Sequence, residues 1–352
     1  MFFYPTKEII ADVAFGIQVG SREQTESPIL KSVRDILHFN QDNDSFIIKL
    51  LFVFPGFAKF FRNFSQVLEN FTGISLGPLA TIKQLYEQMY EIVKVRKEHP
   101  ELKRPDILQS MLDASLVNDE SVSNSANDRE GSKLTVDEVV GNGMVLFFAG
   151  TETTSTFLSW ASYLLASHPD IQQKLYDEIK ILFKDKEINS EIDYDQLMSL
   201  CYLDNVCNEV LRLYPIAFGA VNRYVVDETN LCGIHVPRGV EGVVIDTLSI
   251  HYNERFWGPI DTKVFFPDRF DNQYPTQSER PSSAFLAFGY GPRICLGMRL
   301  AYLEMKMVLA NVLRRFEIQP PTGGFPPNGI ETKATVAIQP INLKIKLVKR
   351  NL

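Results

Sequence analysis

The segment Phe288-Gly-Tyr-Gly-Pro-Arg-Ile-Cys-Leu-Gly297 carries more chemical information than any other part of the chain. Its glycines allow backbone conformations and close approaches that a side chain would block. Cys295 stands just before a helix that we predict to begin near Gly297. The unpaired amides of a helix start and the cation of Arg293 favour the thiolate form of Cys295. From the residues alone, this thiolate is either a nucleophile or a metal ligand.

The segment resembles the haem-binding loop of cytochrome P-450 monooxygenases, in which Phe-Gly-x-Gly-x-Arg-x-Cys-x-Gly surrounds the thiolate that ligates haem iron. Every defined position of that motif is matched here. The resemblance implies that Cys295 is the axial ligand of the iron of haem b (heme b), which a thiolate suits for oxygen activation. It also implies that Phe288 packs near the sulfur, that Arg293 pairs with a haem propionate and that Gly297 belongs to the cofactor loop.

A second motif, Ala149-Gly-Thr-Glu-Thr-Thr154, falls in the middle of a long apolar segment. Thr135-Val-Asp-Glu138 is a capping box that predicts the start of a helix, and Pro169 predicts its end. From the residues alone, the motif is either functional or a Ser/Thr kink in a core helix. The resemblance implies that Ala149 leaves room for O₂, Thr153 hydrogen-bonds the bound oxygen and Glu152 relays protons from solvent.

Further motifs follow in the order in which the family has them. Glu209-Val-Leu-Arg212 and Arg269 in Phe266-Pro-Asp-Arg-Phe270 match a family triad, and the resemblance implies a buried structural role for it beneath the haem. Arg223 matches a position that binds a haem propionate in animal microsomal members. His251 matches a haem-contact or structural position, and its own sequence setting favours a hydrogen-bonded loop histidine.

Periodicity predicts a mainly helical chain with small β-sheets, and the resemblance implies the cytochrome P-450 fold without its N-terminal part. We expect helices at 79–97, 105–116, 136–165, 170–183, 194–214 and 297–316, short strands between 221 and 250, and a terminal hairpin strand at 338–348. The polar segment from Val117 to Lys133 predicts an exposed, flexible loop. Residues 1–352 are expected to form a single domain.

Composition excludes several classes of protein. The 352 residues carry 36 Lys and Arg against 43 Asp and Glu, a net charge of −7 that argues against a nucleic-acid binder. Four cysteines make no disulfide scaffold, and Cys201, Cys207 and Cys232 are predicted to be buried or half-buried spectators. No segment predicts a transmembrane helix. Arg293, Arg299 and Lys306 predict a basic surface on the Cys295 side, suited to an acidic partner.

The resemblance implies a monooxygenase of the animal microsomal, xenobiotic- or steroid-oxidising type. It would insert one oxygen atom of O₂ into a C–H bond of a small lipophilic substrate. No dinucleotide fingerprint is present, so electrons from NADPH require a separate NADPH-cytochrome P-450 reductase, with cytochrome b5 as a further donor. The implied location is the cytosolic face of the endoplasmic reticulum membrane.

Two alternatives stay open at this point. Complete family members have a membrane anchor and a propionate-binding Trp-x-x-x-Arg helix ahead of the segment where this sequence begins, so we expect an N-terminally truncated chain. The first alternative is therefore a non-catalytic fragment that binds haem poorly. The second is a haem-thiolate isomerase or dehydratase that does not use O₂, although such relatives typically lose the threonine that Thr153 represents.

Overall fold

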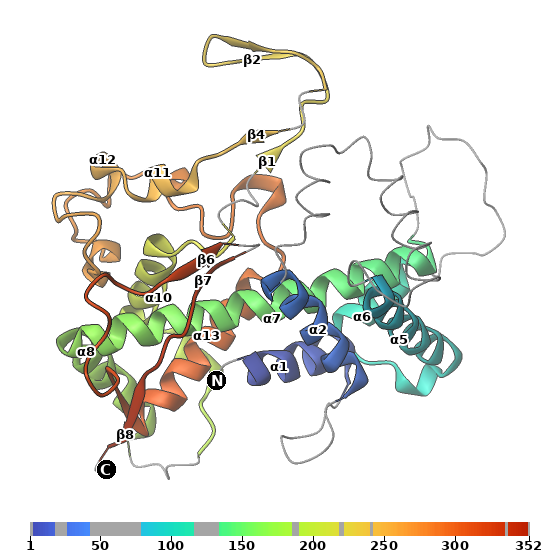
Figure 1. Ribbon diagram of the computed structural model, residues 1–352, viewed down its shortest axis with the longest axis horizontal. Coiled ribbons are helices and arrows are strands. Elements are labelled where there is room, and N and C mark those ends of the chain that lie inside the picture. The colour runs from blue at the N-terminus through green and yellow to red at the C-terminus, as the bar shows by residue number, and fades with distance from the viewer. Residues whose placement is uncertain are drawn as a thin grey trace. The chain divides into compact units, whose positions relative to one another are not determined.

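The computed structural model describes residues 3–17, 27–42, 79–115, 134–184, 190–217, 222–239, 242–334 and 337–350 (Figure 1). The chain divides between Thr151 and Glu152 into two compact units, and each is treated by itself below. The loop predicted at 117–133 lies outside the described residues. Among the residues that are described, no helix is long and apolar enough to cross a membrane.

All the secondary structure described in the N-terminal unit is helical. Helix α1 packs against α6 and helix α2 packs against α5. The Phe15 ring of α1 stacks on Phe147 with centroids 4.5 Å apart, and the buried Arg96 pairs with Asp106 at 3.0 Å. The elements are α1 (Phe3–Phe15), α2 (Pro28–Asp42), α5 (Leu79–Glu98), η2 (Pro100–Leu102), α6 (Ile107–Ser115) and the first half of α7 (Val136–Ser167). The helices predicted at 79–97 and 105–116 are confirmed.

Helix α7 is the long helix that the sequence predicts, and both of its ends are confirmed. The Glu138 amide donates to Thr135 Oγ1 at 3.2 Å and the Thr135 amide donates to Glu138 Oε2 at 2.7 Å, which completes the capping box. The helix ends at Ser167, two residues before Pro169. It is unbroken through the threonine-rich motif, and the buried Thr151 hydroxyl has a partner within the helix, the Phe147 carbonyl at 2.7 Å.

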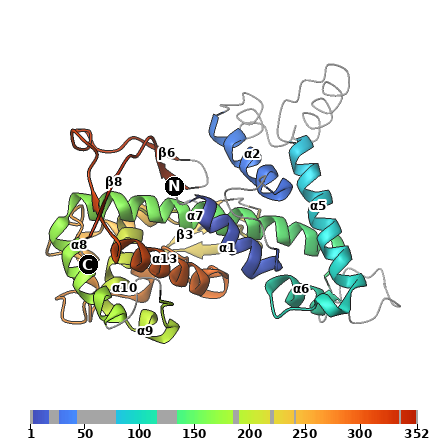
Figure 2. The ribbon, with the colours of Figure 1, turned by 90° about the horizontal axis from the view of Figure 1, so that it is seen from below.

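The C-terminal unit gathers its longer helices, α8, α10 and α13, around one apolar core (Figure 2). Its helices are the second half of α7, α8 (Pro169–Ile179), η3 (Lys180–Phe183), α9 (Tyr194–Met198), α10 (Cys201–Leu213), α11 (Thr247–His251), α12 (Glu254–Trp257), η5 (Pro267–Phe270), η6 (Ser282–Ala284), η7 (Gly291–Arg293) and α13 (Met298–Leu313). The predicted helices at 170–183 and 297–316 are therefore present.

The prediction of one helix over 194–214 is wrong, because the chain turns at Ser199 and Leu200 between α9 and α10. The physical reason lies on another helix. The Glu178 carboxylate of α8 accepts hydrogen bonds from the amides of Tyr202 and Leu203, each at 2.8 Å. Amides in the first turn of a helix have no partner within it, so this distant carboxylate stabilises a new helix start.

Four two-stranded antiparallel sheets complete the described part of this unit: β1 (Asn222–Arg223) with β4 (Val243–Val244), β2 (Thr229–Leu231) with β3 (Ile234–Val236), β5 (Phe316–Gln319) with β8 (Lys346–Lys349), and β6 (Thr332–Ala334) with β7 (Ile338–Pro340). The exposed β2–β3 hairpin projects from the rest of the unit (Figure 1). The strand predicted over 338–348 is instead two strands in different sheets. Pro340 ends β7, because proline has no amide to continue a ladder.

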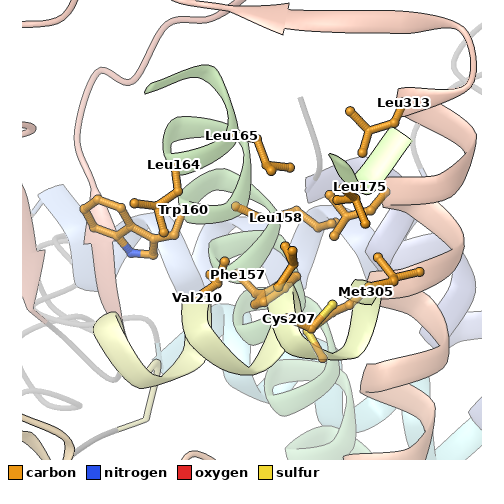
Figure 3. Packing of buried hydrophobic residues seen from close by; sticks show 14 of the residues in the cluster. Phe157, Leu158, Trp160, Leu164, Leu165, Leu175, Cys207, Val210, Met305 and Leu313 are labelled. Carbon is orange, nitrogen blue, oxygen red and sulfur yellow. The ribbon is translucent and has the colours of Figure 1, made fainter. Parts of the chain in front are cut away.

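The core of the C-terminal unit is formed by α7, α8, α10 and α13 (Figure 3). Phe157, Leu158, Leu165 and Val210 are essentially inaccessible to solvent. The Trp160 ring stacks on Tyr214 at 3.8 Å, and its Nε1 donates to the Ile338 carbonyl at 2.8 Å. The apolar residues in the second half of α7 are therefore largely buried, and the single indole donor among them has a partner.

Candidate functional site

The loop that carries Cys295 is closed by its own backbone. Gly289 and Gly291 have φ angles of +77° and +74°, which side chains rarely tolerate. These two turns bring the Cys295 amide back to the Phe288 carbonyl, to which it donates at 2.8 Å. Gly297 is the N-cap of α13, so the thiol is held two residues ahead of that cap.

The part of this loop from Tyr290 to Gly297 is exposed to solvent at every residue, including Cys295 and Arg293. The exposed side chains include three large apolar ones, with Leu296 at 84% exposure, Tyr290 at 54% and Ile294 at 45%. The loop therefore presents a thiol, three large apolar side chains and one guanidinium group to solvent.

His251 connects the segment just before this loop to helix α10. The Leu286 amide donates to His251 Nε2 at 2.8 Å, so the other ring nitrogen carries the proton and donates to the Arg212 carbonyl at 3.1 Å. Burial lowers the pKa of His251 to about 4, which keeps the ring neutral as this pair of bonds requires. His251 is thus a fully hydrogen-bonded histidine, as its sequence setting favoured, but it lies at the end of α11 and not in a loop.

The structure brings Glu209, Arg212 and Arg269 together with no solvent exposure of the three side chains. Arg212 approaches the carboxylate with two nitrogens, Nε at 2.7 Å and Nη2 at 2.8 Å, and Arg269 Nε donates to Glu209 Oε1 at 3.1 Å. The Phe266 amide adds a fourth donor at 3.0 Å. Because the paired charges are also hydrogen-bonded, their burial is compensated.

The two arginines also hold the coil between α11 and η5. Arg212 donates to the carbonyls of His251 and Thr262, each at 2.8 Å. Arg269 donates to the Ile260 carbonyl at 2.8 Å and to those of Trp257 and Asp261. This segment has little regular structure, so its buried carbonyls would otherwise have no partner. The triad therefore supplies the hydrogen bonds that a helix or sheet supplies elsewhere.

Arg280 is a third cation in this region, and the sequence analysis missed it. Its guanidinium lies 3.9 Å from the centre of the Trp257 ring, donates through Nε to the Phe256 carbonyl at 2.9 Å and donates through Nη2 to the Arg269 carbonyl at 3.1 Å. Burial lowers the pKa of Arg280 to about 10. No motif singles out Arg280, since its contacts come from segments that only tertiary folding brings together.

The residues of the second motif lie in the middle of α7. Ala149 is exposed, Thr153 is half-buried and Glu152 is buried. A Cβ atom at Gly150 would lie 2.6 Å from Ile10 Cδ1, so a side chain there would displace the Ile10 side chain. Glu152 accepts a hydrogen bond from Gln339 Nε2 of β7, which fixes one oxygen of its carboxylate.

Glu304 of α13 is a buried acid that the sequence analysis did not select. Its residue is 5% exposed, and its Oε1 has no hydrogen-bond partner. Burial raises the pKa of Glu304 to about 8, although a hydrogen bond with the Thr154 side chain opposes the shift. Glu304 is therefore mostly protonated at neutral pH. An acid on the buried face of an apolar helix was the signal available in the sequence.

We expect Glu304 to make the protein less stable as the pH rises. The folded state keeps the proton up to about pH 8, whereas the unfolded chain loses it near the ordinary value of 4.5. Within that window, the free energy of unfolding falls by about 1.4 kcal/mol per pH unit from this group. Glu304→Gln should remove this slope, so the variant should gain about 3 kcal/mol over the wild type between about pH 5.5 and 7.5.

Urea unfolding at a series of pH values measures this effect. The exposed Glu331→Gln variant removes the same charge without changing a buried group, and it should follow the wild-type pH dependence. Parallel pH profiles of the wild type and Glu304→Gln would contradict the assignment.

The remaining residues singled out from the sequence differ in their exposure to solvent, and some of the predictions for them are wrong. Arg223 is exposed on β1, opposite Val243 of β4. Lys306 does not contribute to a basic surface: it is fully buried, and its Nζ pairs with Asp204 Oδ1 at 2.6 Å. The helix turns Lys306 toward α10, away from Arg293 and Arg299, which are exposed. The prediction for cysteines holds for the buried Cys207 and is wrong for Cys201 and Cys232, which are exposed.

Comparison with known proteins identifies the same family along nearly the whole chain. A family model described as cytochrome P450 matches residues 1–347. The chain is 34% identical over 355 residues to cytochrome P450 CYP13A5 of Caenorhabditis elegans, which covers 97% of this chain and 65% of the relative. It is 33% identical over 316 residues to cytochrome P450 3A13 of Mus musculus, which covers 89% and 57%.

A solved structure gives the same result for the fold. The crystal structure of a cytochrome P450 (CYP102L1) matches with a TM-score of 0.74 and 24% identity, over 99% of this chain and 67% of that one. The predicted mainly helical fold with small sheets is confirmed. The chain spans 57–65% of the length of the two curated relatives above.

Proposed function

The chain belongs to the cytochrome P450 family, and from this membership we propose that it acts as a haem-thiolate monooxygenase. Members of this family hold protoporphyrin IX iron through an axial cysteine thiolate. The proposed reaction inserts one oxygen atom of O₂ into a C–H bond of a small lipophilic substrate. The observation that carries the proposal is the Cys295 loop, in which two left-handed glycines and the Cys295–Phe288 backbone bond present the thiol on an open apolar surface.

The donor set of this loop fits haem. Among the described residues, no group of three or more His, Cys, Asp or Glu side chains could hold a metal ion. Cys295 would supply the one thiolate through which the protein would hold a haem iron. The exposed Ile294 and Leu296 suit the apolar ring, and the exposed guanidinium of Arg293 suits its propionates.

We assign the following roles to the residues of the chain. Cys295 ligates the iron, and Arg293 and Arg223 bind propionates. When bound, the haem supplies the redox chemistry that activates O₂. Thr153 would donate a hydrogen bond to oxygen, and Glu152, whose carboxylate is oriented by Gln339, would pass protons from solvent. Ala149, exposed on α7, leaves room beside that helix.

Partners and location are part of the same proposal. The electrons come from NADPH through a separate cytochrome P-450 reductase, with cytochrome b5 as a further donor. Arg299, exposed on the Cys295 side, favours an acidic surface on that partner. The proposed location is the cytosolic face of the endoplasmic reticulum membrane.

Reconstitution tests this function. The purified chain is loaded with haem, reduced with dithionite and exposed to CO, and then assayed with reductase, NADPH and O₂ on lipophilic substrates. We expect a Soret band at the thiolate-ligated position and turnover that requires both reductase and O₂. Absence of haem uptake would favour the non-catalytic alternative, and turnover of a peroxide without O₂ or reductase would favour the isomerase alternative.

A further inference from the structure

Tyr302 of α13 contacts the Cys295 loop through the ring of Phe288. The two ring centroids are 5.1 Å apart, with the planes inclined by 43°. Phe288 is also the residue whose carbonyl accepts the Cys295 amide at 2.8 Å. A displacement of Phe288 would therefore move the acceptor that closes the loop. The ring of Tyr302 is the aromatic support of that acceptor.

The hydroxyl group of Tyr302 fixes this ring from the other side. It donates to Asn208 Oδ1 of α10 at 2.5 Å. Burial raises the pKa of Tyr302, so the hydroxyl keeps the proton that this bond needs. Asn208 precedes Glu209, whose carboxylate is held by two arginines. The tyrosine thus connects the loop to α10, the helix that carries Glu209 and Arg212.

We propose that Tyr302 is a positioning residue for the thiolate, since it holds Phe288 and with it the backbone bond that fixes Cys295. The proposal rests on the proposed function, because Cys295 is the residue that ligates haem there. It adds a residue outside the Cys295 loop itself, seven positions after the cysteine. Tyr302 reaches the iron ligand only through the ring and carbonyl of Phe288, so it is not a catalytic residue.

Two substitutions separate the ring from the hydroxyl. Tyr302→Leu removes the aromatic contact and the bond to Asn208, whereas Tyr302→Phe keeps the ring and loses only the bond. Tyr252→Phe is the matched control, because the Tyr252 hydroxyl also donates to a buried acceptor, the Leu213 carbonyl at 2.8 Å, without a contact to Phe288. This control removes one buried hydroxyl bond elsewhere in the same unit.

Hydrogen–deuterium exchange of the peptide that contains Cys295 gives a readout that does not depend on haem. Because an aromatic pair stabilises the segment that it holds, we expect amide exchange in this peptide to be about two- to tenfold faster in Tyr302→Leu. Tyr302→Phe should show a smaller increase and Tyr252→Phe none. In the haem-loaded protein, part of the reduced CO complex of Tyr302→Leu should lose the Soret band of thiolate ligation. The reduction potential of the haem should also differ from that of the wild type.

The outcomes separate this inference from the proposed function. A wild-type protein without a thiolate-type CO band would overturn the proposed function, whatever the exchange data show. A wild-type protein with that band, and a Tyr302→Leu variant with unchanged exchange, would overturn the inference alone. Faster exchange with an unchanged CO spectrum and potential would also overturn it, since Tyr302 would then support the loop without positioning the thiolate.

Discussion

Replacement of Cys295 with serine is expected to abolish both the thiolate-type CO spectrum and O₂-dependent turnover. A serine hydroxyl stays protonated at neutral pH and is a poor iron ligand, whereas a thiolate donates electron density that favours O–O cleavage. The substitution changes one atom in an exposed side chain, so the loop backbone and its bond to Phe288 should persist. The expected effect is therefore loss of function in a folded protein, measured by the reduced CO difference spectrum, turnover and circular dichroism.

The chain offers two matched controls for this substitution. Cys201 and Cys232 are exposed like Cys295 but lie outside the loop. Cys201→Ser and Cys232→Ser should keep the CO spectrum and the turnover of the wild type. Retention of both properties by Cys295→Ser would show that the iron ligand is another residue, and the proposed function would fail with it.

Replacement of Glu209 with alanine is expected to prevent stable folding of the C-terminal unit. The substitution leaves the guanidinium groups of Arg212 and Arg269 buried without a counter-ion. Breaking one buried ion pair costs about 3–5 kcal/mol, and two arginines lose their partner here. Because a domain is stable by only about 5–15 kcal/mol in total, we expect a large loss of soluble protein. Urea unfolding or the yield of folded protein measures this.

A surface ion pair in the same region is the comparison. Asp268, next to Arg269, pairs with Lys174 at 2.7 Å, and both side chains are more than a third exposed. Asp268→Asn should cost less than about 1 kcal/mol. If Glu209→Ala were as mild as Asp268→Asn, the three buried charges would not hold the coil, and the structural role of the triad would have to be abandoned.

Much of the architecture was predictable because its causes are local. The capping box at Thr135 and Glu138 and the proline at 169 act within a few residues, so they place both ends of α7 from the sequence. The glycines around Cys295 also act locally, since a left-handed φ is a property of single residues. Motif order then identified the family, which the comparisons confirm.

Two of the errors came from interactions between distant segments. The break between α9 and α10 depends on Glu178, more than twenty positions earlier in the chain. Lys306 reads as a surface cation until Asp204 is placed beside it. In each case a charged side chain found its partner on a different helix, and periodicity within one helix contains no information about that partner.

The amino-acid sequence by itself determined most of the helical framework and the family, because these depend on residue type and on spacing along the chain. Tertiary structure alone decided which buried polar groups have hydrogen-bond partners. Tyr302 donates to Asn208 and packs on Phe288, and His251 bonds to Leu286 and Arg212. One oxygen of Glu304 has no partner. The physical reason is that a buried polar group is stable only beside a partner, and packing brings that partner from a remote part of the chain.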